Sequence, residues 1–221
     1  TFFVEALGAT RWGDGELKKI CSLILEYGHN IQLHLHPKVA LIDGIEIKGD
    51  RLAIHNKETQ KILIETGLEI LDDCGVENVV AFRAGDLAAN EDTLSAMERV
   101  GLFLSSNRDL DKKSSIFSEI NNYFPIKNDF SQKGRMYDLP VTSFSSPLPL
   151  SDGKYRHFEI CALGKLEMKD MLTRMVAAGY SSATILTHPG EFFRRNKTGT
   201  AFVFKNCKRL EMLLACAKTV E

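Results

Sequence analysis

The stretch GHNIQLHLHP, residues 28–37, carries the pattern that decides the fold of this chain. Within residues 30–36 apolar and polar side chains alternate, and this two-residue period predicts a strand with one buried face. Pro37 has no backbone N–H to donate, so it predicts the end of that strand. Ahead of it, residues 14–27 carry apolar side chains at helical spacing, and Gly28 suits the end of a helix. The stretch is therefore predicted to be a strand that directly follows a helix.

The same alternation continues along the chain. Runs rich in β-branched, aromatic and other apolar residues predict strands at 1–5, 30–36, 76–85, 102–106, 136–141 and 182–188. One-face apolar spacing predicts helices at 14–27, 57–74, 91–101, 167–178 and at the carboxyl end of the chain. Such alternation is typical of an α/β fold with a parallel sheet, either open or closed into a barrel. Residues 107–157 interrupt it, and we expect them to form a lobe or binding loop.

The composition excludes several classes of protein. A net charge of −1 over 221 residues implies no general attraction to nucleic acid or to an anionic membrane. No apolar run approaches the ~20 residues that span a bilayer, so no membrane span is expected. Five scattered cysteines without a CxxC pair indicate reduced thiols and predict a cytoplasmic location. The chain begins with a strand pattern and no Met, so we expect part of the domain to precede it.

Three predicted strands end in residues that can carry chemistry. His34 and His36 precede a proline, Arg83 precedes Ala-Gly, and His188 precedes Pro-Gly. In parallel α/β folds functional residues gather at the carboxyl ends of strands, where the loops begin. We therefore expect these four side chains to meet at one end of the sheet.

His34 and His36 share one face of the predicted strand, whereas His29 has the opposite parity and is expected to be structural. Imidazoles two residues apart on a strand are about 6–7 Å apart along it and can reach one divalent ion. The alternative is a pair of core or surface histidines. Arg83 could instead pair with a carboxylate at the rim of the sheet, and His188 could be a satisfied core histidine.

With these strand ends in place, the sequence resembles the polysaccharide deacetylase superfamily, the NodB-homology domains. TFFV, residues 1–4, resembles the strand that follows the first motif of the family. GHNIQLHLHP resembles the second, metal-binding motif in a His-x-His variant, and FRAG, residues 82–85, resembles the third. ILTHP, residues 185–189, resembles the fifth motif, and YDLP, residues 137–140, stands in the place of the fourth.

The resemblance implies a single catalytic domain over residues 1–221, folded as a distorted (β/α) barrel with seven strands, the first of which precedes this chain. It implies a metal-dependent hydrolase that removes an N-acetyl group from a carbohydrate or a small N-acylated, sugar-containing substrate. His34 and His36 would bind a divalent metal ion, commonly Zn²⁺, and His188 would be the general acid. Arg83 would orient the catalytic base through an ion pair.

The chain also departs from the family pattern. The motif that supplies two aspartates, one ligand and one base, would lie ahead of Thr1. Ala84-Gly85 replaces the Pro-Tyr of the third motif, and Asp86 follows as a candidate substrate-binding carboxylate or a plain rim aspartate. Trp12 could stack on the face of a sugar, or it could be a loop aromatic packed on the core.

Two other functions remain open on the sequence alone. One is a sugar-binding barrel that has lost its chemistry, and the other is a different metallohydrolase that uses His-x-His on a strand, such as a phosphoesterase or amidohydrolase. The substrate, the metal, the oligomeric state and the pathway do not follow from the sequence.

Overall fold

The computed structural model describes residues 1–108, 123–124, 129–145, 155–196 and 199–217. The chain divides into two compact units, which are described separately. The described part of the first unit is residues 1–108, 123–124 and 131–139, and that of the second is residues 129–130, 140–145, 155–196 and 199–217. The expectation of one domain over residues 1–221 stays a prediction.

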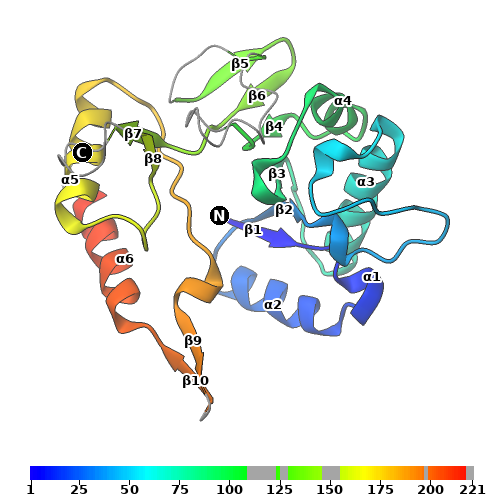
Figure 1. Ribbon diagram of the computed structural model, residues 1–221, viewed down its shortest axis with the longest axis horizontal. Helices are drawn as coiled ribbons and strands as arrows, with labels where there is room; N and C mark the ends of the chain where they lie inside the picture. Colours follow the sequence, from blue (N-terminus) through cyan, green and yellow to red (C-terminus); the bar gives the residue numbers. More distant parts are fainter. Residues whose placement is uncertain (109–122, 125–128, 146–154, 197–198, 218–221) are drawn as a thin grey trace. The chain divides into compact units, whose positions relative to one another are not determined.

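The first unit contains a six-stranded, mostly parallel sheet, so the predicted α/β class is confirmed (Figure 1). The strands are β1 (Phe2–Glu5), β2 (Ile31–Leu35), β3 (Ala81–Ala84), β4 (Leu104–Ser105), β5 (Ser131–Lys133) and β6 (Met136–Asp138). Their order is β1-β2-β3-β4-β6-β5, and among these neighbours only β5 and β6 pair antiparallel. Within the described residues the sheet has six strands, and the seven-stranded barrel stays a prediction.

The helices of the first unit are α1 (Ala9–Trp12), α2 (Gly15–Glu26), α3 (Lys57–Asp73) and α4 (Glu91–Arg99), with short 3₁₀ turns η1 (Pro37–Val39), η2 (Leu52–Ile54) and η3 (Gly85–Leu87). Asn56 and Asn90 are the N-cap residues of α3 and α4. The side-chain oxygen of each accepts a hydrogen bond from the backbone N–H of the residue three positions further along the chain. The predicted helices at 14–27, 57–74 and 91–101 are confirmed to within two residues at each end.

One face of the sheet forms the hydrophobic core. Leu33, Leu35 and Phe82 are fully buried and pack in one cluster with side chains of α2, α3 and α4. Gly67 lets α3 approach closely, because a Cβ there would lie 2.8 Å from the Leu35 side chain. Since side chains alternate along a strand, the opposite face carries the residues between these, including His34 and Arg83.

The described part of the second unit contains two antiparallel strand pairs and two helices. The strands are β7 (Ser143–Ser145), β8 (Tyr155–His157), β9 (Phe193–Asn196) and β10 (Gly199–Phe202), and the helices are α5 (Lys165–Ala177) and α6 (Phe204–Ala217). A 3₁₀ turn, η6 (Pro189–Glu191), precedes β9. Met168 and Met171 of α5 are buried and pack with Phe158 and Leu213 in the core of this unit.

The predicted strand at 182–188 is wrong in extent. The structure places only an isolated parallel bridge there, between Glu159 and Leu186. The N–H of Thr184 donates to the Thr142 hydroxyl at 2.8 Å rather than to a backbone carbonyl, so no continuous ladder forms. The lobe expected at 107–157 contains β5, β6, β7 and β8 among the described residues, and the rest of it lies outside them.

None of the described helices combines the length and the apolar character needed to cross a membrane. The five cysteines all lie among the described residues, and none is in a disulfide.

Candidate metal centre

Three side chains stand in one row across the carboxyl ends of β1, β2 and β3. Glu5 is the register partner of His34, and His34 is the register partner of Arg83. Adjacent partners in a parallel sheet point to the same face, so this row lies on the face opposite the helices. His36, two residues beyond His34, brings its ring centroid to 4.9 Å from that of His34. The sequence therefore predicted correctly that His34, His36 and Arg83 come together.

His34 is held by the neighbouring strand. Its Nδ1 lies 2.6 Å from the carbonyl oxygen of Arg83. A carbonyl can only accept, so this contact selects the tautomer that carries its proton on Nδ1 and its lone pair on Nε2. An imidazole oriented in this way, by a backbone carbonyl on the other nitrogen, is typical of metal-binding histidines.

His36 is held by a carboxylate that the sequence did not single out. Its Nδ1 lies 3.0 Å from Oδ2 of Asp50, and the same Asp50 oxygen accepts from Nζ of Lys38 at 2.8 Å. Burial acts to raise the pKa of Asp50, but the hydrogen bonds from Lys38 and His36 outweigh it and hold that pKa below its ordinary value. An ionised Asp50 thus orients His36 as a carboxylate orients a metal-binding histidine.

Gly85 makes room for the His36 ring. A Cβ at position 85 would lie 2.6 Å from both Cε1 and Nδ1 of His36, and 3.1 Å from the backbone oxygen of Leu35. The FRAG sequence therefore has a steric reason for its glycine: the imidazole rests directly on the backbone at the end of β3.

Glu5 is a further residue of this row that the sequence pattern did not reveal. Its Oε1 accepts from the N–H of Leu7 at 2.8 Å and its Oε2 from the N–H of Gly8 at 3.0 Å, while the His36 N–H lies 3.5 Å from Oε1. Burial raises the pKa of Glu5, and these hydrogen bonds act against the rise. Its position at the end of β1 was a signal that could have found it, whereas residues 40–51 gave no periodic signal for Asp50.

Arg83 is buried and is held by Ser106, the residue that follows β4. Its Nε donates to the Ser106 carbonyl at 3.2 Å, its Nη2 donates to the Ser106 hydroxyl at 2.7 Å, and its guanidinium lies 4.2 Å from the centroid of the Phe3 ring. Burial lowers the pKa of Arg83 to about 10. Within the described residues no carboxylate forms an ion pair with Arg83, so the expected orientation of a base by this arginine stays a prediction.

The two candidate substrate-binding residues lie in segments that follow these strands, Trp12 after β1 and Asp86 after β3. Asp86 is exposed in η3, where Asp86 and Leu87 both adopt a φ of 54°; non-glycine residues with this backbone are strained and concentrate at functional sites. Trp12, in α1, is 71% exposed, with the Arg11 guanidinium 5.9 Å from its ring centroid. This exposure excludes the alternative in which Trp12 packs in the core.

Asp138, from the place of the fourth motif, is a core residue. Its Oδ2 accepts from Nε of Arg108 at 2.7 Å, and both side chains are completely buried. Burial raises the pKa of Asp138 to about 6 against the effect of Arg108. Its Oδ1 has no hydrogen-bond partner among the described residues. The Arg108–Asp138 pair joins β6 to the end of β4, next to the serine that holds Arg83.

His188 belongs to the second unit, so its expected meeting with His34 and His36 stays a prediction. It is the residue before η6, its side chain is 63% exposed, and its Nδ1 lies 3.4 Å from Oε1 of Glu191. The exposure is against the alternative of a satisfied core histidine. Glu159 lies in the same cluster, where burial and then the neighbouring Glu191 carboxylate raise the pKa of Glu159.

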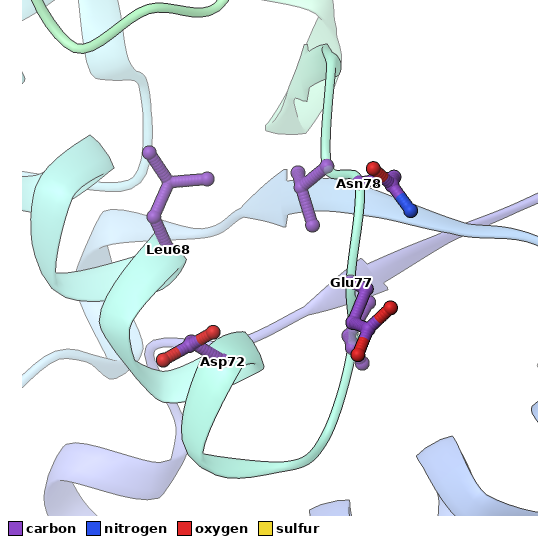
Figure 2. Close-up of a pocket in the computed structure, with 6 residues that line it drawn as sticks. Leu68, Asp72, Glu77 and Asn78 are labelled. Carbon is purple, nitrogen blue, oxygen red and sulfur yellow. The ribbon is translucent and has the colours of Figure 1, made fainter.

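A surface hollow of about 460 Å³ lies elsewhere in the first unit. Figure 2 shows it between the end of α3, with Leu68 and Asp72, and the loop that carries Glu77 and Asn78 toward β3. This loop enters β3 at its amino end, whereas functional residues of parallel sheets gather at the carboxyl ends. The hollow is therefore separate from the His34–His36 pair.

The chain was compared with protein-family models, with curated protein sequences and with solved structures, and none of the three comparisons gives a match.

Proposed function

We propose that this chain is a metal-dependent hydrolase that removes an N-acetyl group from a carbohydrate or another sugar-containing substrate. One observation carries the proposal: His34 and His36 lie with ring centroids 4.9 Å apart at the end of a parallel strand, and each has its Nδ1 bound to an oxygen. Two imidazoles oriented in this way fit the nitrogen ligands that zinc prefers. The four motifs in family order support the same reaction class.

The donor chemistry of the site agrees with this metal. Each histidine would offer Nε2, because the proton of each ring is placed on Nδ1 by the Arg83 carbonyl or by Asp50. A divalent ion held there would polarise the acetamide carbonyl and lower the pKa of a bound water. Glu5 is not proposed as a further metal ligand, because both of its carboxylate oxygens already accept from backbone N–H groups.

The other residues would bind substrate and move protons. His188 would protonate the departing amine as the C–N bond breaks, and its 63% exposed side chain is accessible to a substrate. The buried cation of Arg83 lies in the same row as His34 and would favour negative charge at that end of the sheet. Trp12 and Asp86 would bind the sugar, Trp12 by stacking on a ring face and Asp86 by accepting from hydroxyl groups.

The proposal is tested by acetate release from a panel of N-acetylated mono- and oligosaccharides, using protein loaded with Zn²⁺ or Co²⁺. We expect at least one substrate to be hydrolysed, and the His34→Ala/His36→Ala double variant to lose the activity. His29→Ala is the matched control, because His29 is exposed and contacts Phe2 rather than the site. Activity that survives the double substitution would contradict the proposed site.

A sugar-binding barrel without chemistry is the second candidate, and the exposed Trp12 favours it equally. Binding of the same sugars, measured by calorimetry, without acetate release and without dependence on His34 or His36 would support that candidate instead. Phosphate release from phosphate esters that is lost in the double variant would favour another His-x-His metallohydrolase.

A further inference from the structure

The second unit gathers a different set of metal-ligating side chains. Glu159, His188 and Glu191 each offer one ligand atom, and these atoms all lie within 4.8 Å of one another. Nitrogen and oxygen donors are thereby brought together by residues 159–191 alone.

The spacing of these atoms suits a single small cation. His188 Nδ1 and Glu191 Oε1 are 3.4 Å apart. Two ligands on a tetrahedral zinc, with bonds of about 2.0–2.1 Å, are separated by about 3.3–3.4 Å. A carboxylate oxygen of Glu159 lies within 4.8 Å of both of these atoms, so it too is close enough to share the ion.

The backbone holds these side chains in place. Glu159 and Leu186 form a parallel bridge, which fixes the segment before His188 against the segment that carries Glu159. Oε2 of Glu191 accepts from the Thr187 hydroxyl at 2.7 Å and from the His188 N–H at 3.1 Å. One oxygen of Glu191 is therefore anchored, and the other, Oε1, is the one that faces His188.

The donor set indicates which cation would bind. Two carboxylates within 4.8 Å of one another repel when both are ionised, and a divalent cation removes that repulsion. A histidine among the donors favours zinc or another late first-row metal over Mg²⁺ or Ca²⁺, which prefer oxygen ligands alone.

We propose that Glu159, His188 and Glu191 bind a divalent cation of the zinc class. This binding does not depend on His34 or His36. One consequence rests on the function proposed above: a cation on Nδ1 of His188 prevents this histidine from acting as the general acid, so excess zinc would inhibit the hydrolase.

The test is a zinc titration, by competition with a chromophoric chelator, of the His34→Ala/His36→Ala protein. This background removes the first pair, so zinc that still binds reports on the second cluster. Adding Glu191→Gln is expected to weaken binding by at least about tenfold. Adding Glu211→Gln, which changes an exposed carboxylate of α6 in the same unit, is expected to leave it unchanged.

A second readout tests the histidine ligand. With Co²⁺ in place of zinc, ligand-field absorption bands are expected, and adding His188→Ala should shift or remove them. Circular dichroism confirms that each variant is folded. If the His34→Ala/His36→Ala protein binds no zinc, or if Glu191→Gln and Glu211→Gln bind it equally, the cluster is not a metal site. Neither result bears on zinc binding by His34 and His36, so the two proposals fail separately.

Discussion

The two candidate histidine sites differ in how their imidazoles are held. His34 is bound by the backbone of the neighbouring strand, 49 positions away in the chain, through a 2.6 Å contact. His188 follows an irregular segment, and its 3.4 Å partner, Glu191, lies only three residues further on. The His36 side chain is 32% exposed and that of His188 is 63% exposed. The first site is thus oriented by sheet register, and the second by the local turn.

This difference has an energetic consequence. A side chain fixed by long-range pairing loses its orientation only when the sheet opens, whereas a side chain fixed by a short turn can reorient locally. We therefore expect substitutions around the first site to change stability and metal affinity together. Equivalent substitutions in the second unit should have smaller effects on stability.

The largest contrast is expected between one ion pair in each unit. Arg108→Met leaves the completely buried Asp138 carboxyl without its cation and should cost about 3–5 kcal/mol in the free energy of unfolding. Glu167→Gln breaks the pair with Arg156, whose side chain is 34% exposed, and should cost about 1 kcal/mol. Urea unfolding of the two variants checks both values, and equal losses would contradict the contrast.

The next largest effect concerns Gly85, which lies two residues after Arg83, and Gly190, which lies two residues after His188. Gly85→Ala places a Cβ 2.6 Å from the His36 ring and should cost about 1–3 kcal/mol, because neither the ring nor the strand backbone can move freely. Gly190→Ala meets nothing within 4 Å and should change stability by no more than about 0.5 kcal/mol. Thermal unfolding measures both. A neutral Gly85→Ala would mean that His36 is not held against this backbone.

A smaller effect tests the carboxylate behind His36. Asp50→Asn keeps the size of the side chain but removes its charge, so the pair with His36 is weakened. We expect zinc affinity at the His34–His36 pair to fall by about 10–100-fold, as when other carboxylates behind metal-binding histidines are removed. Chelator competition measures the change. Asp43→Asn, an exposed aspartate of the same connection, is the control and should bind zinc like the unsubstituted protein.

A further effect is a pH dependence from Asp138. Its pKa is raised from an ordinary 3.8 to about 6 in the folded protein, so between about pH 4 and pH 6 the folded state holds a proton that the unfolded state has lost. Its contribution to stability is therefore fully present below about pH 4 and is lost as the pH rises through about 6. The difference in unfolding free energy between the unsubstituted protein and Asp138→Asn, measured by urea unfolding from pH 4 to 8, should show this fall. A difference that is constant with pH would contradict the raised pKa.

Much of the first unit could be predicted from the sequence, because its signals are periodic. The alternation in residues 30–36 and the one-face spacing of residues 57–74 each reflect burial of one side of a regular element, and both elements are found. The meeting of His34 with Arg83 followed from the rule that parallel strands end at the same edge.

The partners of these residues could not be predicted in the same way. Asp50 reaches His36 from an irregular connection, and Ser106 reaches Arg83 from the end of a strand whose polar residues gave no separate signal. The strand expected at 182–188 failed because an apolar run does not show whether a neighbouring backbone will complete the ladder; here the Thr142 hydroxyl occupies that place.

The central claim is that His34 and His36 bind a divalent metal ion, and it is tested most directly by a zinc titration of the Glu191→Gln protein. In that background the second cluster is weakened, so tight binding reports on the strand-end pair. The account predicts one equivalent of tightly bound zinc, lost when His34→Ala and His36→Ala are added and kept when His29→Ala is added. Tight zinc binding that persists without His34 and His36, or no tight binding in the Glu191→Gln protein itself, would contradict it.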